Sequence, residues 1–245
     1  MGALLDFTDR VVVITGAASG IGAAATDLLL DQGAEVHAVD LAPVSAAVAQ
    51  TYACDIGDER SIDAVVEALP KEVDVLFNCA GVPNGGRFTP EQVMRINWLG
   101  LRHLTEALLP RLGGGAVVHV ASTAGRGWPD RVDAMTDLMA ATSFADGLAW
   151  VRANVDRCGD GYALSKEAVQ YYTMWRALQT LDRGVRMNSI CPGVTNTSLV
   201  EDFRRGVGSD VLDRATALVG RMAEPTEMAP ALLFLADEAS SSYIN

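Results

Sequence analysis

Val11-Val-Val-Ile-Thr-Gly-Ala-Ala-Ser-Gly-Ile-Gly22 predicts a buried strand, a glycine turn and the start of a helix. The β-branched run predicts the strand, and the Ala/Leu-rich stretch after the turn predicts the helix. That stretch ends at Gly33, and glycine is favoured just after the C-terminus of a helix. Unpaired amides and the positive end of a helix meet at such a turn, so a pyrophosphate can bind there without any basic side chain. A tight strand–helix turn with incidental glycines is the alternative for this motif alone.

A second predicted strand, residues 35–39, ends in Asp40, which lies 18 residues after Gly22. An acidic residue at about this distance meets the adenosine ribose hydroxyls in a dinucleotide-binding unit. Its carboxylate would repel a 2′-phosphate, and Leu41 follows where an arginine would accept one. The sequence therefore predicts NAD and makes NADP the less favoured cofactor. Asp40 would also suit an ordinary strand end that caps the next turn.

Strands and helices continue to alternate along the chain. Such alternation predicts a Rossmann fold, a doubly wound parallel sheet with helices on both faces, and 245 residues suit a single domain over residues 1–245. The further strands are predicted at residues 51–54, 73–77, 116–120 and 185–190.

Polar residues follow three of the predicted strands. Asp55, Asn78 and Ser122 would lie at the edge where an open parallel sheet presents its ligand crevice. Asp55 is predicted to contact adenine and Asn78 to brace neighbouring strands, unless either is a plain turn residue. Ser122 lies at the carboxyl end of a predicted central strand, a position that suits a substrate contact. Packing alone does not account well for a serine there.

The acidic composition excludes several classes of partner. A net charge of -12 argues against a nucleic-acid or anionic-membrane surface, since phosphate binding needs clustered Lys and Arg. The 4 cysteines and 3 histidines show no metal-ligand spacing, so no metal is assigned and the thiols are expected to be reduced. No leader-like or long apolar run occurs, so the expected location is cytoplasmic.

Residues 126–160 interrupt the alternation with two amphipathic segments. We predict a helical insertion that serves as a lid, an oligomer interface or both, although an apolar stripe more often packs within its own chain. Farther along, residues 194–222 combine a polar loop with a short helix beside the same sheet edge, and they are the predicted substrate loop.

Tyr162 and Lys166 are four residues apart, so in a helix both side chains project from one face. An unperturbed tyrosine, with a pKa of about 10, is a poor base near neutral pH until a neighbouring positive charge favours the phenolate. The pair is a candidate proton-transfer device, and a solvated surface pair is the alternative. Asn97 lies among apolar residues of a helix predicted over residues 90–112, so its amide is either a structural group or part of a polar relay.

Together these features resemble the short-chain dehydrogenase/reductase family over essentially the whole chain. The motifs, in family order, are Thr15-Gly-x-x-x-Gly-x-Gly22, Asp40, Asp55, Asn78-Cys-Ala-Gly81, Asn97, Ser122, Tyr162-x-x-x-Lys166 and Pro192-Gly193. The gap of 40 residues between Ser122 and Tyr162 is wider than usual, and the extra helices resemble the bacterial 3α-hydroxysteroid dehydrogenase/carbonyl reductase branch. That branch implies a homodimer built on residues 132–155, and the wider family implies a homotetramer.

The resemblance implies a catalytic tetrad of Asn97, Ser122, Tyr162 and Lys166. Tyr162 would exchange a proton with the substrate oxygen while hydride moves between substrate and nicotinamide C4. Lys166 would favour the phenolate and hold the ribose hydroxyls, Ser122 would hydrogen-bond the substrate oxygen, and Asn97 would hold a relay water. The implied cofactor-binding residues are Gly16, Ser19, Gly20, Ile21, Asp40, Leu41, Asp55, Ile56, Asn78, Ala80, Gly81, Tyr162, Lys166, Pro192, Gly193, Val194 and Thr195.

The expected activity is NAD-dependent interconversion of a secondary alcohol and a ketone on a small hydrophobic substrate, with a 3α-hydroxysteroid or an aromatic alcohol as candidates. One alternative is an epimerase or dehydratase that retains its nicotinamide, against which the glycine spacing and the short C-terminal region count. Another is a non-catalytic dinucleotide-sensing protein, against which the intact tetrad counts. Cys79 and Leu164 depart from the family pattern in positions that affect fit and leave the chemistry in place.

Overall fold

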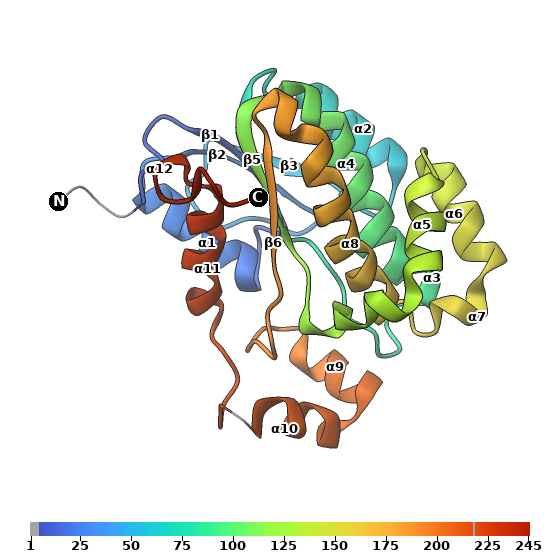
Figure 1. Cartoon of the computed structure of the whole chain (residues 1–245). Helices are drawn as coiled ribbons and strands as arrows, with labels where there is room; N and C mark the ends of the chain where they lie inside the picture. The colour runs from blue at the N-terminus through green and yellow to red at the C-terminus, as the bar shows by residue number, and fades with distance from the viewer. Residues whose placement is uncertain (1–4, 218) are drawn as a thin grey trace.

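The computed structural model describes residues 5–217 and 219–245 and confirms the doubly wound parallel sheet (Figure 1). Within these residues the sheet has six strands in the order β3-β2-β1-β4-β5-β6, and every pairing is parallel. Parallel neighbours require crossover connections, which the intervening helices supply. The strands are β1 (Val11–Thr15), β2 (Glu35–Asp40), β3 (Gln50–Ala53), β4 (Val73–Asn78), β5 (Leu112–Val120) and β6 (Arg186–Ile190).

Helices cover both faces of the sheet (Figure 1). One face packs on α1 (Gly20–Asp31) and α11 (Pro225–Ala236), and the other on α2 (Glu59–Ala68), α4 (Leu101–Leu108) and α8 (Tyr162–Thr180). Across the described residues, no helix combines the length and the apolar character needed to cross a bilayer. The remaining α-helices are α3 (Pro90–Met94), α5 (Val132–Ala140), α6 (Phe144–Ala153), α7 (Val155–Cys158), α9 (Val200–Val207), α10 (Ser209–Ala217) and α12 (Glu238–Ser241).

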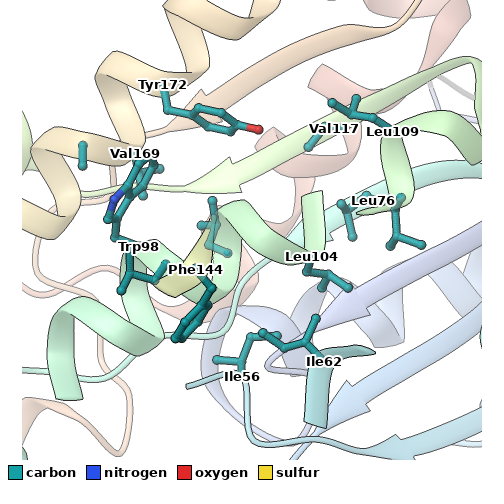
Figure 2. Packing of buried hydrophobic residues seen from close by; sticks show 14 of the residues in the cluster. Ile56, Ile62, Leu76, Trp98, Leu104, Leu109, Val117, Phe144, Val169 and Tyr172 are labelled. Atoms are coloured by element: carbon teal, nitrogen blue, oxygen red, sulfur yellow. The ribbon is translucent and has the colours of Figure 1, made fainter. Parts of the chain in front are cut away.

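Side chains of each central strand alternate between two hydrophobic cores. On β1, Val13 belongs to the core beneath α2, α4 and α8, whereas Val12 and Ile14 belong to the core beneath α1 and α11. A parallel sheet that is covered on both faces needs apolar residues on both, which explains the unbroken apolar run. Figure 2 shows the first core, where the rings of Trp98 and Tyr172 meet edge to face with centroids 5.4 Å apart.

The helix predicted over residues 90–112 is confirmed as helical from Pro90 to Arg111, although it is not a regular α-helix throughout. The segment divides into α3, a π-helical turn η1 (Arg95–Gly100), α4 and a 3-10 turn η2 (Leu109–Arg111), and Leu112 already belongs to β5. The backbone of η1 presses against the loop after β3, because a Cβ on Gly100 would lie 1.7 Å from the carbonyl oxygen of Ile56. Helical periodicity does not reveal a π-helical turn, which inserts one extra residue without changing the apolar character of the segment.

We expect Gly100→Ala to lower the free energy of unfolding by roughly 2–3 kcal/mol, because the new methyl group must displace backbone atoms. Gly113→Ala is the matched control, since a Cβ there would meet no heavy atom within 4 Å. That variant should stay within about 0.5 kcal/mol of the parent chain. Urea unfolding measures both, and equal midpoints for the two variants would contradict the packing argument.

The insertion packs on its own chain as α5, α6 and α7. Met135 and Phe144 are buried in the core beneath α8, as is Leu138. Arg102 of α4 donates hydrogen bonds to the carbonyl oxygens of Leu138 at 2.8 Å and Met139 at 3.1 Å. The last carbonyls of a helix lack partners within the helix, so Arg102 fastens the end of α5 to α4.

Candidate active site

A cavity of about 630 Å³ opens where the carboxyl ends of the strands meet. Its wall takes residues that follow β1, β4, β5 and β6, and others from α8, α9 and α10. Two of the predicted site residues, Asn78 and Asn97, do not line it. The predicted residues that do are Gly16, Ser19, Gly20, Ile21, Asp40, Leu41, Asp55, Ile56, Ala80, Gly81, Ser122, Tyr162, Lys166, Pro192, Gly193, Val194 and Thr195.

The glycine turn after β1 lets backbone approach backbone. A Cβ on Gly16 would lie 2.7 Å from the amide nitrogen of Ala80, and one on Gly22 would lie 2.1 Å from the Gly16 carbonyl oxygen. Gly16 also has φ 70°, a conformation that glycine adopts readily. Ser19 precedes α1 without a side-chain cap, and the first residues of α1 line the cavity. The turn therefore leaves backbone donors at the positive end of a helix, which is the chemistry that a pyrophosphate needs.

Asp40 ends β2 and lines the same cavity. Its Oδ2 accepts the N–H of Ala18 at 2.9 Å, and its Oδ1 accepts the N–H of Ala42 at 2.8 Å. The carboxylate thus holds the glycine turn in place. Because an ionised carboxylate offers about four acceptor sites, it keeps capacity for a ligand hydroxyl. The neighbouring Leu41 is 72% exposed and places no charge beside it.

Asn78 braces the sheet from behind the cavity wall. Its side chain is buried, and its Nδ2 donates to Thr105 Oγ1 at 3.0 Å and lies 3.1 Å from His119 Nδ1. These contacts join β4 to α4 and to β5. Burial, with a smaller contribution from the charge of Lys166, lowers the pKa of His119 to about 3. His119 is therefore a neutral core residue at physiological pH.

Asn97, in the π-helical turn η1, holds the backbone that forms part of the cavity wall. Its Oδ1 accepts the N–H of Val82 at 2.8 Å, while its Nδ2 donates to the Val82 carbonyl at 2.9 Å and to Ser165 Oγ at 3.3 Å. A Cβ on Gly81 would lie 3.3 Å from Asn97 Oδ1 and 3.6 Å from Lys166 Nζ. Only the bare Gly81 therefore separates the amide of Asn97 from Lys166.

Strand β5 and helix α8 bring Ser122, Tyr162 and Lys166 together. The N–H of Tyr162 donates to Asp160 Oδ1 at 2.9 Å, which holds the start of α8. One turn later, Lys166 is buried, with its Nζ donating to the Val120 carbonyl at 2.8 Å and lying 5.9 Å from the Tyr162 ring centroid. Ser122 lies near enough to the phenol of Tyr162 to lower its pKa, and its Oγ accepts the N–H of Ala124 at 3.1 Å.

Burial sets the protonation of both α8 residues. It raises the pKa of Tyr162 to about 12, a rise that the hydroxyl of Ser122 opposes and the negative charge of Asp160 increases. Burial also lowers the pKa of Lys166 to about 8, because an ammonium is costly to hold away from water. The expectation that Lys166 favours the phenolate leaves out this desolvation, which is the largest influence on Tyr162 in the folded chain.

Residues far along the sequence close the cavity over Tyr162. Phe203 of α9 meets the Tyr162 ring edge to face, with centroids 4.9 Å apart. The same helix is fastened to the loop after β4, because the buried Asp202 accepts hydrogen bonds from Arg87 at 3.1 Å and from Arg205 at 3.0 Å. The aromatic contact adds to the burial of Tyr162, and nothing in the local sequence of either residue indicates it.

The insertion contributes little to this wall. None of residues 132–155 lines the cavity, whereas Arg126, at the start of the segment, does. Asn84 and Phe88, from the loop after β4, line it as well. Sequence reasoning did not single out Arg126, and the only available signal was its position four residues after Ser122.

Comparisons with known proteins agree with this geometry. A family model described as enoyl-(acyl carrier protein) reductase matches residues 16–245. Coniferyl-alcohol dehydrogenase of Pseudomonas sp. (strain HR199) is 33% identical over 238 residues, covering 96% of this chain and 92% of its own. The 3-alpha-hydroxysteroid dehydrogenase/carbonyl reductase of Comamonas testosteroni is 31% identical over 243 residues, covering 94% and 91%. Among solved structures, 3-alpha-hydroxysteroid dehydrogenase from Pseudomonas sp. B-0831, complexed with NADH, gives a TM-score of 0.77 at 27% identity, covering 96% and 92%.

Proposed function

Because this chain belongs to the short-chain dehydrogenase/reductase family, we propose that it is an NAD-dependent dehydrogenase that interconverts a secondary alcohol and a ketone on a hydrophobic substrate. Family membership makes it an oxidoreductase that binds a nicotinamide dinucleotide and acts on a small alcohol or ketone. The choice of NAD and of the substrate class is the proposal. The observation that carries it is the convergence of Ser122, Tyr162 and Lys166 on the cavity that also contains the glycine turn and Asp40.

The residues of the cavity fit a dinucleotide. A pyrophosphate requires backbone N–H donors, which the close turn at Gly16 and the uncapped start of α1 supply. A ribose requires an acceptor for its hydroxyls, which the carboxylate of Asp40 supplies. We assign Asp55 and Ile56 to the adenine, and Val194 and Thr195 to the carboxamide of the nicotinamide. When bound, the cofactor supplies the carbon that accepts or returns hydride.

Side chains of the protein transfer the proton that accompanies hydride transfer. In alcohol oxidation, the Tyr162 oxygen removes the proton from the substrate hydroxyl, and in ketone reduction it returns one. Ser122 donates a hydrogen bond to the substrate oxygen and holds it beside Tyr162. Lys166 binds the ribose hydroxyls and places a positive charge one helical turn from Tyr162. Asn97 acts on Lys166 and on the Val82 backbone from behind the wall, as a positioning residue.

The substrate half of the cavity favours an apolar body. It is lined by Val82, Phe88, Leu199, Phe203 and Leu212. Two of these residues lie in α9 and α10, which supports assigning residues 194–222 as the substrate loop. The relatives named for coniferyl alcohol and for 3-alpha-hydroxysteroids also act on molecules with large apolar bodies, so an aromatic alcohol or a hydroxysteroid is the proposed class.

A panel of secondary alcohols, 3α-hydroxysteroids and aromatic alcohols, assayed for reduced cofactor with NAD and NADP in parallel, tests the function. We expect NADH formation with at least one hydrophobic alcohol and a clear preference for NAD. A preference for NADP would defeat the assignment of Asp40. Conversion of substrate without net NADH would indicate an epimerase or a dehydratase that retains its nicotinamide.

Asp160→Asn should move the pH dependence of alcohol oxidation. Oxidation requires the deprotonated Tyr162, so kcat/KM rises with pH, and the Asp160 charge raises the pKa of Tyr162. Removing that charge lowers the pKa, so the rising limb should shift to lower pH. Asparagine keeps an oxygen that can accept the N–H of Tyr162, the bond that Asp160 Oδ1 makes in the parent chain. A pH profile of kcat/KM measures the shift, and a limb that moves to higher pH contradicts the proposed role of Tyr162.

We also propose that the chain assembles as a homodimer or a homotetramer. Large apolar side chains are exposed together on the second half of α8 and just after it: Met174, Trp175, Leu178 and Leu181. Val132 and Val155, in the insertion, are exposed as well. Light scattering of the purified chain reports the number of subunits, and charged substitutions at Leu178 or Val155 identify which surface is used.

A further inference from the structure

Arg126 is a cation without a partner in the wall of the cavity. Within residues 5–217 and 219–245, no acidic side chain, carbonyl or aromatic ring is paired with its guanidinium, and the residue is exposed. Arg60, Arg183 and Arg214 also lack such partners in that part of the chain, but none of them lines the cavity. The chain carries 31 acidic and 19 basic residues, yet none of the described acidic side chains is paired with the arginine that lines this cavity.

The backbone on either side of Arg126 is held rigidly. A Cβ on Gly125 would lie 2.6 Å from the carbonyl oxygen of Lys166, and one on Gly127 would lie 2.7 Å from Glu167 Oε1. Both neighbours of Arg126 are therefore pressed against α8. The carboxylate of Glu167 is ion-paired with another arginine, because Arg131 donates a hydrogen bond to Glu167 Oε2 at 3.0 Å.

Arg126 lies on the substrate side of the cavity. It follows β5, as Ser122 does, whereas Asp40 and Asp55 follow β2 and β3. In the strand order, β1 and β4 separate β2 from β5, and neighbouring strands lie about 4.8 Å apart. The adenosine end of the cavity is therefore remote from Arg126. Lys166 is the other cation of the described wall, and it is buried and already bonded to the Val120 carbonyl.

We infer that Arg126 binds a carboxylate at the end of the substrate remote from the reacting carbon, so that the substrate is an amphipathic hydroxy acid. The inference rests on the proposed function and names its substrate class. The apolar wall takes the body of the molecule, Ser122 and Tyr162 take the hydroxyl, and the planar guanidinium takes the acid. One unaccompanied arginine matches the single charge of a carboxylate, whereas a doubly charged phosphate would call for a second cation.

Matched acid and ester pairs test the inference. The pairs are a 3α-hydroxysteroid with a carboxylate side chain and its methyl ester, and 4-(1-hydroxyethyl)benzoic acid, an aromatic secondary alcohol, and its methyl ester. For the pair that is oxidised, we expect kcat/KM to be about tenfold to a hundredfold higher for the acid, mainly through a lower KM. Arg126→Gln should bring the ratio near one, and Arg126→Lys should restore part of it.

Arg183→Gln is the matched control, because it removes the same charge from an exposed arginine outside the cavity. Its acid-to-ester ratio should equal that of the parent chain. An unchanged ratio in Arg126→Gln, or an ester that is preferred by the parent chain, overturns the inference while the dehydrogenase activity stands.

A binding measurement separates this inference from the proposed function. Calorimetry with a steroid acid that lacks the 3-hydroxyl, and with its methyl ester, needs no turnover. Tighter binding of the acid that disappears in Arg126→Gln supports the carboxylate site even if no alcohol is oxidised, in which case the proposed function alone fails. Equal binding of acid and ester by the parent chain overturns the carboxylate site.

Discussion

Tyr162→Phe should lower kcat for alcohol oxidation by about 10²–10⁴-fold, the contribution typical of a positioned general acid or base. Phenylalanine keeps the ring that packs against Phe203 and loses only the oxygen that exchanges the proton. The start of α8 should also be preserved, because the cap formed by Asp160 uses the backbone N–H of residue 162. Steady-state kinetics on the best alcohol of the panel measures the loss.

Two controls isolate the chemical step. Tyr243→Phe removes a phenol that is fully exposed and lies outside the cavity, so its kcat should match the parent chain. Titration of Tyr162→Phe with NADH, followed by cofactor fluorescence, should give a Kd close to that of the parent chain. Full activity in Tyr162→Phe would show that another group moves the proton, and the roles of Ser122 and Lys166 would then need reassignment.

Asp40→Ser should shift the ratio of kcat/KM for NAD over NADP by on the order of 10²-fold toward NADP. A carboxylate beside a 2′-phosphate costs several kcal/mol, since like charges that are brought together repel strongly. Serine removes that charge. Its hydroxyl oxygen can still accept a hydrogen bond from the Ala18 N–H, which Asp40 accepts in the parent chain. Parallel kinetics with the two cofactors give the ratio.

Asp58→Ser is the charge-matched control for this substitution. Asp58 caps α2 by accepting the N–H of Arg60 and does not line the cavity. Serine also caps helices well, so both folding and the cofactor ratio should change little. If Asp40→Ser leaves the ratio where it was, the carboxylate does not select the cofactor, and its hydrogen bonds to Ala18 and Ala42 remain its whole role.

Local motifs were enough to predict the sheet and most of the cavity wall. The glycine turn at Gly16 follows β1, Asp40 ends β2 and Ser122 follows β5, and parallel strands place their carboxyl ends along one edge. The same reasoning predicted the helical character of residues 90–112 but missed the π-helical turn within it, because such a turn depends on what packs against it. It gave Asn78 two roles, a brace between strands and a cofactor contact, and the contacts of its amide with Thr105 and His119 behind the wall are those of a brace.

Residue identity and spacing alone determined where backbone approaches backbone in the glycine turn, that an acid ends β2, and that Tyr162 and Lys166 share one helical face. These are properties of a few consecutive residues. The tertiary structure decided the protonation of that pair, because desolvation depends on Phe203 and on residues packed from distant elements. It likewise decided that Arg126 lines the cavity without a partner, since the acid nearest to its backbone is paired with Arg131. Burial and ion pairing are sums over neighbours in space, and sequence spacing specifies only neighbours along the chain.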